Sequence, residues 1–215
     1  MSRVKSVIIL ILLFPAVVSG QSAKKYTLEI FEEGLASGLE KLFYLPDVNR
    51  NYQFVFVVNE PNIRGAIHNN FIKSVIRKTA EKDNIRYSFT DNPDSISKDS
   101  VFYIIYTSQV ELETKYPRFI KNRFLGDKTI ERNITGNIFA DMRSSDNTFS
   151  HRENIALRYT DEIEYDSYKS YESPEYIFTT AKPPHTGAFE SVLFPALLVT
   201  ISAAATILFF TIRSK

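Results

Sequence analysis

The C-terminal end of the chain constrains its fold most. Residues 191–212 (SVLFPALLVTISAAATILFFTI) carry no charge, and Arg213, Ser214 and Lys215 end the sequence. As an α-helix this stretch would be about 33 Å long at about 1.5 Å per residue, and the hydrocarbon core of a bilayer is about 30 Å thick. We therefore predict a transmembrane helix at 191–212. The basic residues of 213–215 indicate a cytoplasmic tail.

The N-terminal end predicts export. Arg3 and Lys5 precede an apolar run over residues 7–18, and Ser19 and Gly20 follow it. A basic start, a short apolar run and small residues are typical of a secretory signal peptide, which we place at 1–20. Cleavage before Gln21 and retention of the segment both stay open. Together the two ends predict a single-pass membrane protein with a periplasmic domain on a bacterial inner membrane.

Charge and cysteine content restrict the exported part. All 25 Asp and Glu lie in residues 21–190, whereas Arg3, Lys5, Arg213 and Lys215 of the 26 Lys and Arg lie outside it, so its net charge is about −3. This charge argues against a nucleic-acid partner, because such proteins neutralise phosphates with a basic surface. With no cysteine, the domain must be stabilised by its core, and a bacterial envelope protein fits better than a disulfide-rich animal receptor.

The first half of the domain alternates helices and strands. Residues 26–44 have apolar positions at helical spacing, and residues 67–82 repeat that pattern. Residues 52–58 and 85–90 are rich in β-branched and aromatic side chains, as strands are. The order strand, helix, strand predicts a crossover unit with parallel strands. Gly34 and Gly38 predict close packing of the first helix on a sheet or on another helix.

The second half predicts an antiparallel meander. Residues 101–106 form an apolar strand that alternation extends to 112. Residues 130–143 alternate apolar and polar side chains, with Phe139 as the exception, and residues 155–159 resemble the return strand. The predicted fold is α+β: a mixed sheet with an N-terminal α-β-α-β segment, a C-terminal meander, two amphipathic helices on the sheet and a transmembrane helix. We assign this exported domain to 21–178 and a linker to 179–190.

No catalytic, cofactor or metal signature is present. The three histidines, His68, His151 and His185, are dispersed, and the chain has neither a nucleophile elbow nor a phosphate-binding loop. We therefore predict no catalytic residue, cofactor or metal ligand. An enzyme assembled from distant residues remains the alternative, namely a membrane-tethered hydrolase with His151 as base beside Asp141 or Asp161.

Three tyrosines mark the most unusual local composition. Tyr165, Tyr168 and Tyr171 recur at every third position of an acidic segment over 161–175. Tyrosine is enriched at protein interfaces, so we predict that this stripe contacts a partner. Two other interpretations stay open: a solvated connection before the linker, and a calcium site made by the carboxylates of the segment.

Two further features concern association and modification. Ala196, Thr200 and Ala204 form a small-residue ridge on the predicted span, which permits self-association of transmembrane helices. Asn133 begins an N-glycosylation motif, which matters only if the chain is a eukaryotic surface protein, the third hypothesis. The leading hypothesis is a non-enzymatic envelope protein that acts as a scaffold or accessory module. Its predicted partners are the lipid bilayer and another envelope protein.

Overall fold

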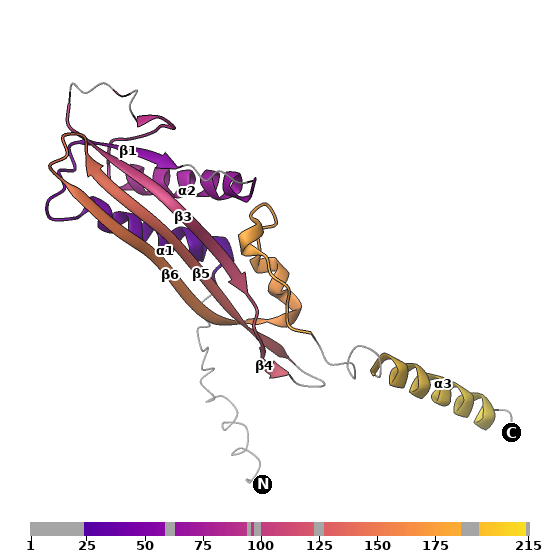
Figure 1. The fold of residues 1–215 in the computed structure, drawn as a ribbon. Helices are drawn as coiled ribbons and strands as arrows, with labels where there is room; N and C mark the ends of the chain where they lie inside the picture. The colour runs from indigo at the N-terminus through magenta and orange to yellow at the C-terminus, as the bar shows by residue number, and fades with distance from the viewer. Residues whose placement is uncertain are drawn as a thin grey trace, which may run out of the picture.

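The computed structural model describes residues 24–58, 63–93, 96, 100–122, 127–185 and 194–213. The predicted signal peptide, 1–20, lies outside these residues. Figure 1 shows an α+β domain in which two helices cover one face of a long mixed sheet, as predicted. Its elements are α1 (Thr27–Phe43), β1 (Gln53–Val58), α2 (Ile63–Lys82), β2 (Tyr87–Phe89), β3 (Phe102–Lys115), β4 (Phe119–Asn122), β5 (Lys128–Ser144), β6 (Ser150–Glu164), the 3-10 helices η3 (Tyr165–Tyr171) and η4 (Ile177–Thr179), and α3 (Phe194–Arg213).

The sheet combines both predicted halves. β1 lies between β2 and β3 and is parallel to each of them. β3, β5 and β6 form an antiparallel meander, in which β5 is the central strand. β4, which the sequence analysis did not predict, pairs with the start of β5 on the side that β3 occupies further along. The meander strands extend well beyond β1, so among the described residues no strand pairs with the second half of β3 on the β1 side.

The main core lies between the helices and one face of the sheet. Phe31, Leu35 and Leu42 of α1 are buried, because their spacing places them on one side of the helix. Aromatic rings fill the layer, and the rings of Phe43 and Phe54 meet edge to face with centroids 5.2 Å apart. Every β1 side chain after Gln53 is buried, which confirms the prediction that this strand is covered on both faces.

The opposite face of β5 is wet, as its alternation predicts. From Ile130 onward, even-numbered residues face the helices and are buried, whereas odd-numbered residues are partly or fully exposed. Phe139 belongs to the exposed set, with 40% of its surface accessible. Phe139 is therefore an exposed apolar residue on the wet face, and the alternation of buried and exposed positions continues through it.

Two glycines allow α1 to approach the sheet closely. A Cβ on Gly38 would lie 2.2 Å from Cγ2 of Ile155, and a Cβ on Gly34 would lie 2.4 Å from Cδ1 of Leu157. Real Cβ atoms do not approach other atoms this closely, so with any larger residue either the β6 side chain or the helix would have to shift. The structure thus confirms the predicted close packing of the Gly34 and Gly38 pair, and it identifies the sheet, not another helix, as the partner.

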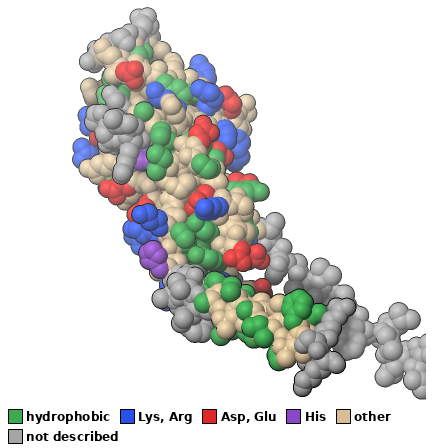
Figure 2. Space-filling view, turned by 90° about the vertical axis from the view of Figure 1, so that its right-hand side faces the viewer, with side chains coloured by type: hydrophobic (Ala, Val, Ile, Leu, Met, Phe, Trp, Pro, Cys, Tyr) green, Lys and Arg blue, Asp and Glu red, His purple; other side chains and the backbone are tan. Residues whose placement is uncertain are grey.

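The predicted transmembrane segment 191–212 is helical over α3, but its membrane-spanning role is not supported. Among the residues that the structure describes, no helix is both long and apolar enough to cross a membrane. The described side chains of α3, from Pro195 to Thr211, are all exposed, and most of them are apolar (Figure 2).

We predict that Gly38→Ala destabilises the domain, measured as the free energy of unfolding in urea. Overpacking typically costs about 1–3 kcal/mol, and this exceeds the gain of about 1 kcal/mol from replacing glycine inside a helix. In an Ile155→Ala background the clash is relieved, so the same substitution should become neutral or stabilising. Equal losses in both backgrounds would contradict the close approach.

Candidate binding groove

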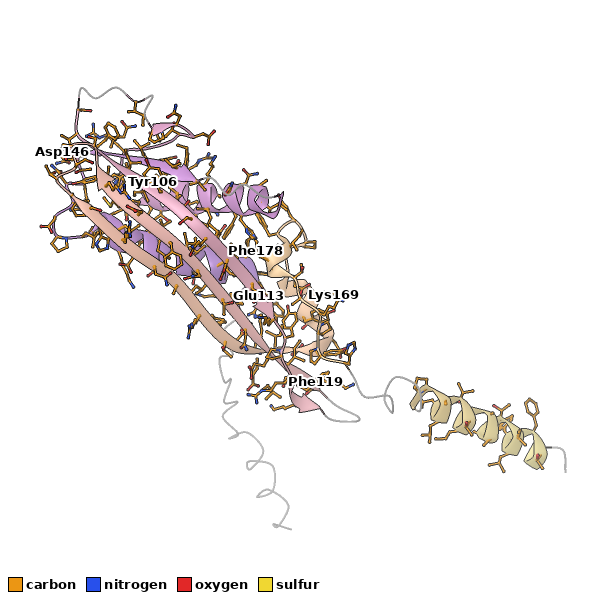
Figure 3. The ribbon with its side chains drawn as sticks, in the orientation of Figure 1. Tyr106, Glu113, Phe119, Asp146, Lys169 and Phe178 are labelled. Atoms are coloured by element: carbon orange, nitrogen blue, oxygen red, sulfur yellow. The ribbon has the colours of Figure 1, made fainter. Side chains whose placement is uncertain are left out.

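A cavity of about 500 Å³ lies beside the lower half of β3. α2 contributes one wall, and η4 with the segment after it contributes the other. Figure 3 labels Glu113 of β3 and Phe178 of η4, which line this cavity. Figure 2 shows the molecule turned by 90° from that view, with the right-hand side of Figure 3 facing the reader. We call this cavity the β3 groove. It is lined by Ile67, His68, Leu112, Glu113, Thr114, Lys115, Tyr116, Pro117, Ile177, Phe178, Thr180, Ala181 and Lys182.

The groove follows an edge of β3 that no described strand occupies. β1 pairs with β3 only as far as Thr107. A bulge follows at Gln109, which has a positive φ of 51° and shifts the register with β5. Beyond it Glu111 pairs with Asn137 of β5. Because Glu131 donates its N–H to Arg118, odd-numbered β5 residues direct their backbone groups away from β6, toward β3 and β4.

Leu112 and Thr114 consequently direct their backbone groups away from β5. Glu111 and Glu113 face odd-numbered β5 residues, and backbone direction alternates along a strand. The N–H and C=O groups of Leu112 and Thr114 therefore point toward the groove. Among the described residues no strand pairs with them. An extended segment placed in the groove would find these groups ready for strand addition.

One buried polar atom also lies beside the groove. Thr114 is 4% exposed, and its hydroxyl has no hydrogen-bond partner among the described residues. Such an atom costs free energy when it stays unpaired. Around it the lining is largely apolar, with Leu112 and Phe178 buried in the main core. The ring of Phe178 is held by those of Phe31 and Phe71, with centroids 5.0 and 4.9 Å away.

Glu172 fixes the outer wall of the groove. Its Oε1 accepts hydrogen bonds from the hydroxyl of Tyr116, at 3.0 Å, and from the backbone N–H of Ala181, at 3.1 Å. Burial raises the pKa of the Tyr116 phenol well above its usual range, and the charge of Glu172 raises it further. Tyr116 therefore stays protonated and serves as a donor. Thr179 closes the same turn by donating its hydroxyl to the carbonyl of Ser173.

The base of this wall contains a fully buried arginine. Arg132 is 0% exposed. Its Nε and Nη2 donate to the two carboxylate oxygens of Asp161 at 2.8 and 2.6 Å. Nη1 donates to the hydroxyl of Thr27 and Nη2 to the carbonyl of Lys25, both at 3.0 Å. The guanidinium also lies 5.3 Å from the ring centroid of Tyr171. One side chain thus joins β5, β6, the start of α1 and η3.

The predicted tyrosine stripe lies on this base. Tyr165, Tyr168 and Tyr171 are half-buried and pack on a second, small core that contains Tyr116, Ile130 and Ile163. Tyr168 meets Tyr116 edge to face at 5.4 Å, and Tyr165 lies 5.2 Å from Phe119. The three side chains therefore support the groove wall. The part of each that remains exposed is where the predicted partner contact would have to occur.

The residues of the alternative hydrolase site do not come together. His151 pairs in register with Met142 and Arg152 with Asp141, so His151 and Asp141 lie on opposite faces of the sheet. Asp161 follows His151 along the same strand by about 33 Å. His151 instead contacts Glu153, with 3.3 Å between Nε2 and Oε2. Hydrogen bonds from Arg143, and then from Arg152, hold the pKa of Asp141 below its usual range.

The remaining candidate residues have separate positions. Within the described residues no group of three His, Cys, Asp or Glu side chains is placed to hold a metal ion. Asn133 lies on the wet face, where it contacts Glu131 and Thr160 at 3.1 and 3.0 Å. The ridge of small residues lies on α3, and the hydroxyl of Thr200 donates to the carbonyl of Ala196 at 2.8 Å. Ala204, also on α3, is exposed.

Comparisons with known proteins do not identify a family for this chain. No family model matches the chain, and no curated protein matches it. Among solved structures, it is similar to a crystal structure described as that of a neuraminyllactose-binding hemagglutinin homolog from Helicobacter pylori. The TM-score is 0.36 at 12% sequence identity, over 58% of this chain and 74% of that chain. A similarity of this size carries no information about function.

We predict that Asp161→Asn lowers the free energy of unfolding by about 3 kcal/mol, because removing one partner leaves a buried charge without compensation. Asp141→Asn is the matched control, since that carboxylate pairs with the more exposed Arg143 and Arg152 and exposed ion pairs contribute little. Urea titration of both variants measures the difference. Similar losses for the two would contradict the importance of burial at Arg132.

Proposed function

We propose that this protein is a non-enzymatic scaffold or accessory module of the bacterial cell envelope, whose exported α+β domain binds an extended segment of another envelope protein in the β3 groove. The observation that carries the proposal is the unpaired edge of β3. Leu112 and Thr114 offer backbone groups to the groove beside apolar side chains and the Thr114 hydroxyl, which has no partner within the described part of the chain. Strand addition satisfies such groups, while pockets for alternate side chains give specificity.

The same proposal includes a membrane anchor. It rests on the uncharged stretch 191–212, on the basic residues after it, and on the exposure of every described side chain of α3. Leu197, Val199 and Phe210 are among its exposed apolar side chains, and a soluble domain rarely leaves so continuous an apolar surface uncovered. A bilayer would cover it and would keep the domain on the periplasmic face of the inner membrane.

Binding in the groove is tested at Ile177, which lines the groove and is 59% exposed. We expect Ile177→Asp to weaken binding of the partner about tenfold or more without unfolding the domain, because the new carboxylate would be buried by the partner. The partner is the protein that co-purifies with the full chain from detergent-extracted membranes. Its affinity for the purified variants is then measured by titration.

The matched control is Ile120→Asp, which changes a 37% exposed isoleucine of β4 that does not line the groove. It should leave the affinity unchanged. If the two variants bind the partner equally well, or if the wild-type chain retains no partner at all, the groove is not the binding site.

The anchor is tested by protease accessibility. Protease added to spheroplasts should digest the domain, because residues 21–190 would face the periplasm, whereas inverted inner-membrane vesicles should protect it. Immunoblotting for the domain, with a cytoplasmic protein as the internal control, gives the result. Protection in spheroplasts with digestion in inverted vesicles would refute the proposed orientation, and recovery in the soluble fraction would refute the anchor.

A further inference from the structure

A further edge of the sheet is formed by β6, and near the end of this strand Lys24 donates to the outward carbonyl of Glu162. The strand pairs with β5 continuously, from Ser150 opposite Arg143 to Glu164 opposite Thr129, and no other described strand lies on its far side. It contains neither a bulge nor a proline, two of the devices that commonly prevent an edge from pairing with another chain. This edge is long enough to take a partner strand.

Contacts at the two ends of β6 show which of its residues direct their backbone N–H and C=O groups toward β5 and which direct them outward. Ser144 donates its N–H to the carbonyl of Phe149 at 3.0 Å, so odd-numbered residues of β6 direct their backbone groups to β5. At the other end the ammonium of Lys24 donates to the carbonyl of Glu162, so even-numbered residues direct theirs outward. If the added antiparallel strand is itself a β6, its even-numbered residues also direct their backbone groups outward. Even-numbered residues of one strand must then pair with even-numbered residues of the other.

We propose that the partner strand is β6 of a second copy, paired antiparallel about a two-fold axis at Ala156. Three such registers keep nearly the full strand paired, with their axes at Ala156, Leu157 or Arg158. The axis at Leu157 places Glu153 opposite Asp161, and the axis at Arg158 places that arginine opposite itself. The axis at Leu157 also places Arg152 opposite Glu162, which offsets part of this repulsion. Like charges directly opposite destabilise a pair of strands, so each of these registers contains a repulsive contact that the axis at Ala156 avoids.

The axis at Ala156 places no like charges opposite each other. His151 then faces Asp161 of the second copy, Asn154 faces Arg158, and Ile155 faces Leu157. Each contact occurs twice, as a two-fold interface requires. The cavity between α1 and the middle of β6 is lined on the α1 side by Gly34, Ser37, Gly38 and Lys41.

Anchoring in one membrane is compatible with this dimer. A two-fold axis that relates two chains in the same membrane must stand along the membrane normal, so the joined sheet would lie along the membrane surface. The chain between Lys182 and Phe194 can reach at most about 40 Å, which allows each anchor to enter the bilayer beneath its own domain. The axis passes between the two β6 strands, and the β3 groove lies outside the interface.

The sequence provides a direct test because it contains no cysteine. In the proposed register the two Ala156 residues form a hydrogen-bonded pair with Cα atoms about 5.5 Å apart, a separation that a disulfide accepts. We expect the full-length Ala156→Cys protein, oxidised in its native membrane, to run as a covalent dimer on a non-reducing gel. The double variant Asn154→Cys with Arg158→Cys should cross-link as well, since those positions face each other.

The single variants Asn154→Cys and Arg158→Cys are the matched controls, because each would lie about 13 Å from its symmetry copy. They should remain monomeric. The inference is overturned if Ala156→Cys stays monomeric while the domain keeps its resistance to trypsin, or if Arg158→Cys alone cross-links as fully as Ala156→Cys. Ala156→Lys offers a second readout: it should reduce the size of the detergent-solubilised protein to that of a monomer, whereas Ala156→Ser should not.

Discussion

Arg132 carries a full positive charge in a place that water does not reach. The start of α1, the end of β6 and η3 are arranged around it and supply the groups that pair its charge and accept its hydrogen bonds. A buried guanidinium is tolerated only when its charge is paired and its donors are used. Asp161 supplies the counter-charge from the neighbouring strand, while Thr27 and the carbonyl of Lys25 use the remaining directions. The start of α1 and the end of β6 are thereby fixed to the same point of β5.

The groove depends on this arrangement through a chain of contacts. Tyr171 lies over Arg132 and belongs to η3, whose other tyrosines pack on Tyr116 and Phe119. Glu172 follows directly and holds both Tyr116 and Ala181. The wall that faces the β3 edge is therefore built by a polar and aromatic cluster at its base, and by the main core where Phe178 packs against both Phe31 and Phe71.

The sequence predicted the local elements well because periodicity reports burial directly. The alternation over 130–143 identified β5, and the glycine pair identified the close side of α1. The sequence also contains a sign of the buried arginine. Arg132 occupies the apolar phase between Ile130 and Ile134, and Asp161 occupies the corresponding phase before Ile163. The ion pair could not be predicted from this pattern, because the strand register is needed to show that Arg132 and Asp161 are neighbours.

Groove and edges could not be predicted for a related reason. Periodicity shows which face of a strand is buried but not where its neighbour stops. The end of β1 at Val58 leaves β3 open, and the last position of β6 in the sheet leaves its outer edge open. Both openings are consequences of strand lengths and strand order. The tyrosine stripe shows the same limit. Its spacing indicated a contact surface, but it did not indicate that the three side chains pack largely against the small core of their own chain.

Hydrogen exchange of the full-length Arg132→Met variant tests this account most directly. If Arg132 fixes the wall of the groove, backbone amides over 24–30 and 165–181 should lose protection, while those of β1 and α2 should exchange as they do in the wild type. Unchanged exchange over 165–181, or an equal rise throughout the domain, would contradict the dependence of the groove on this arginine.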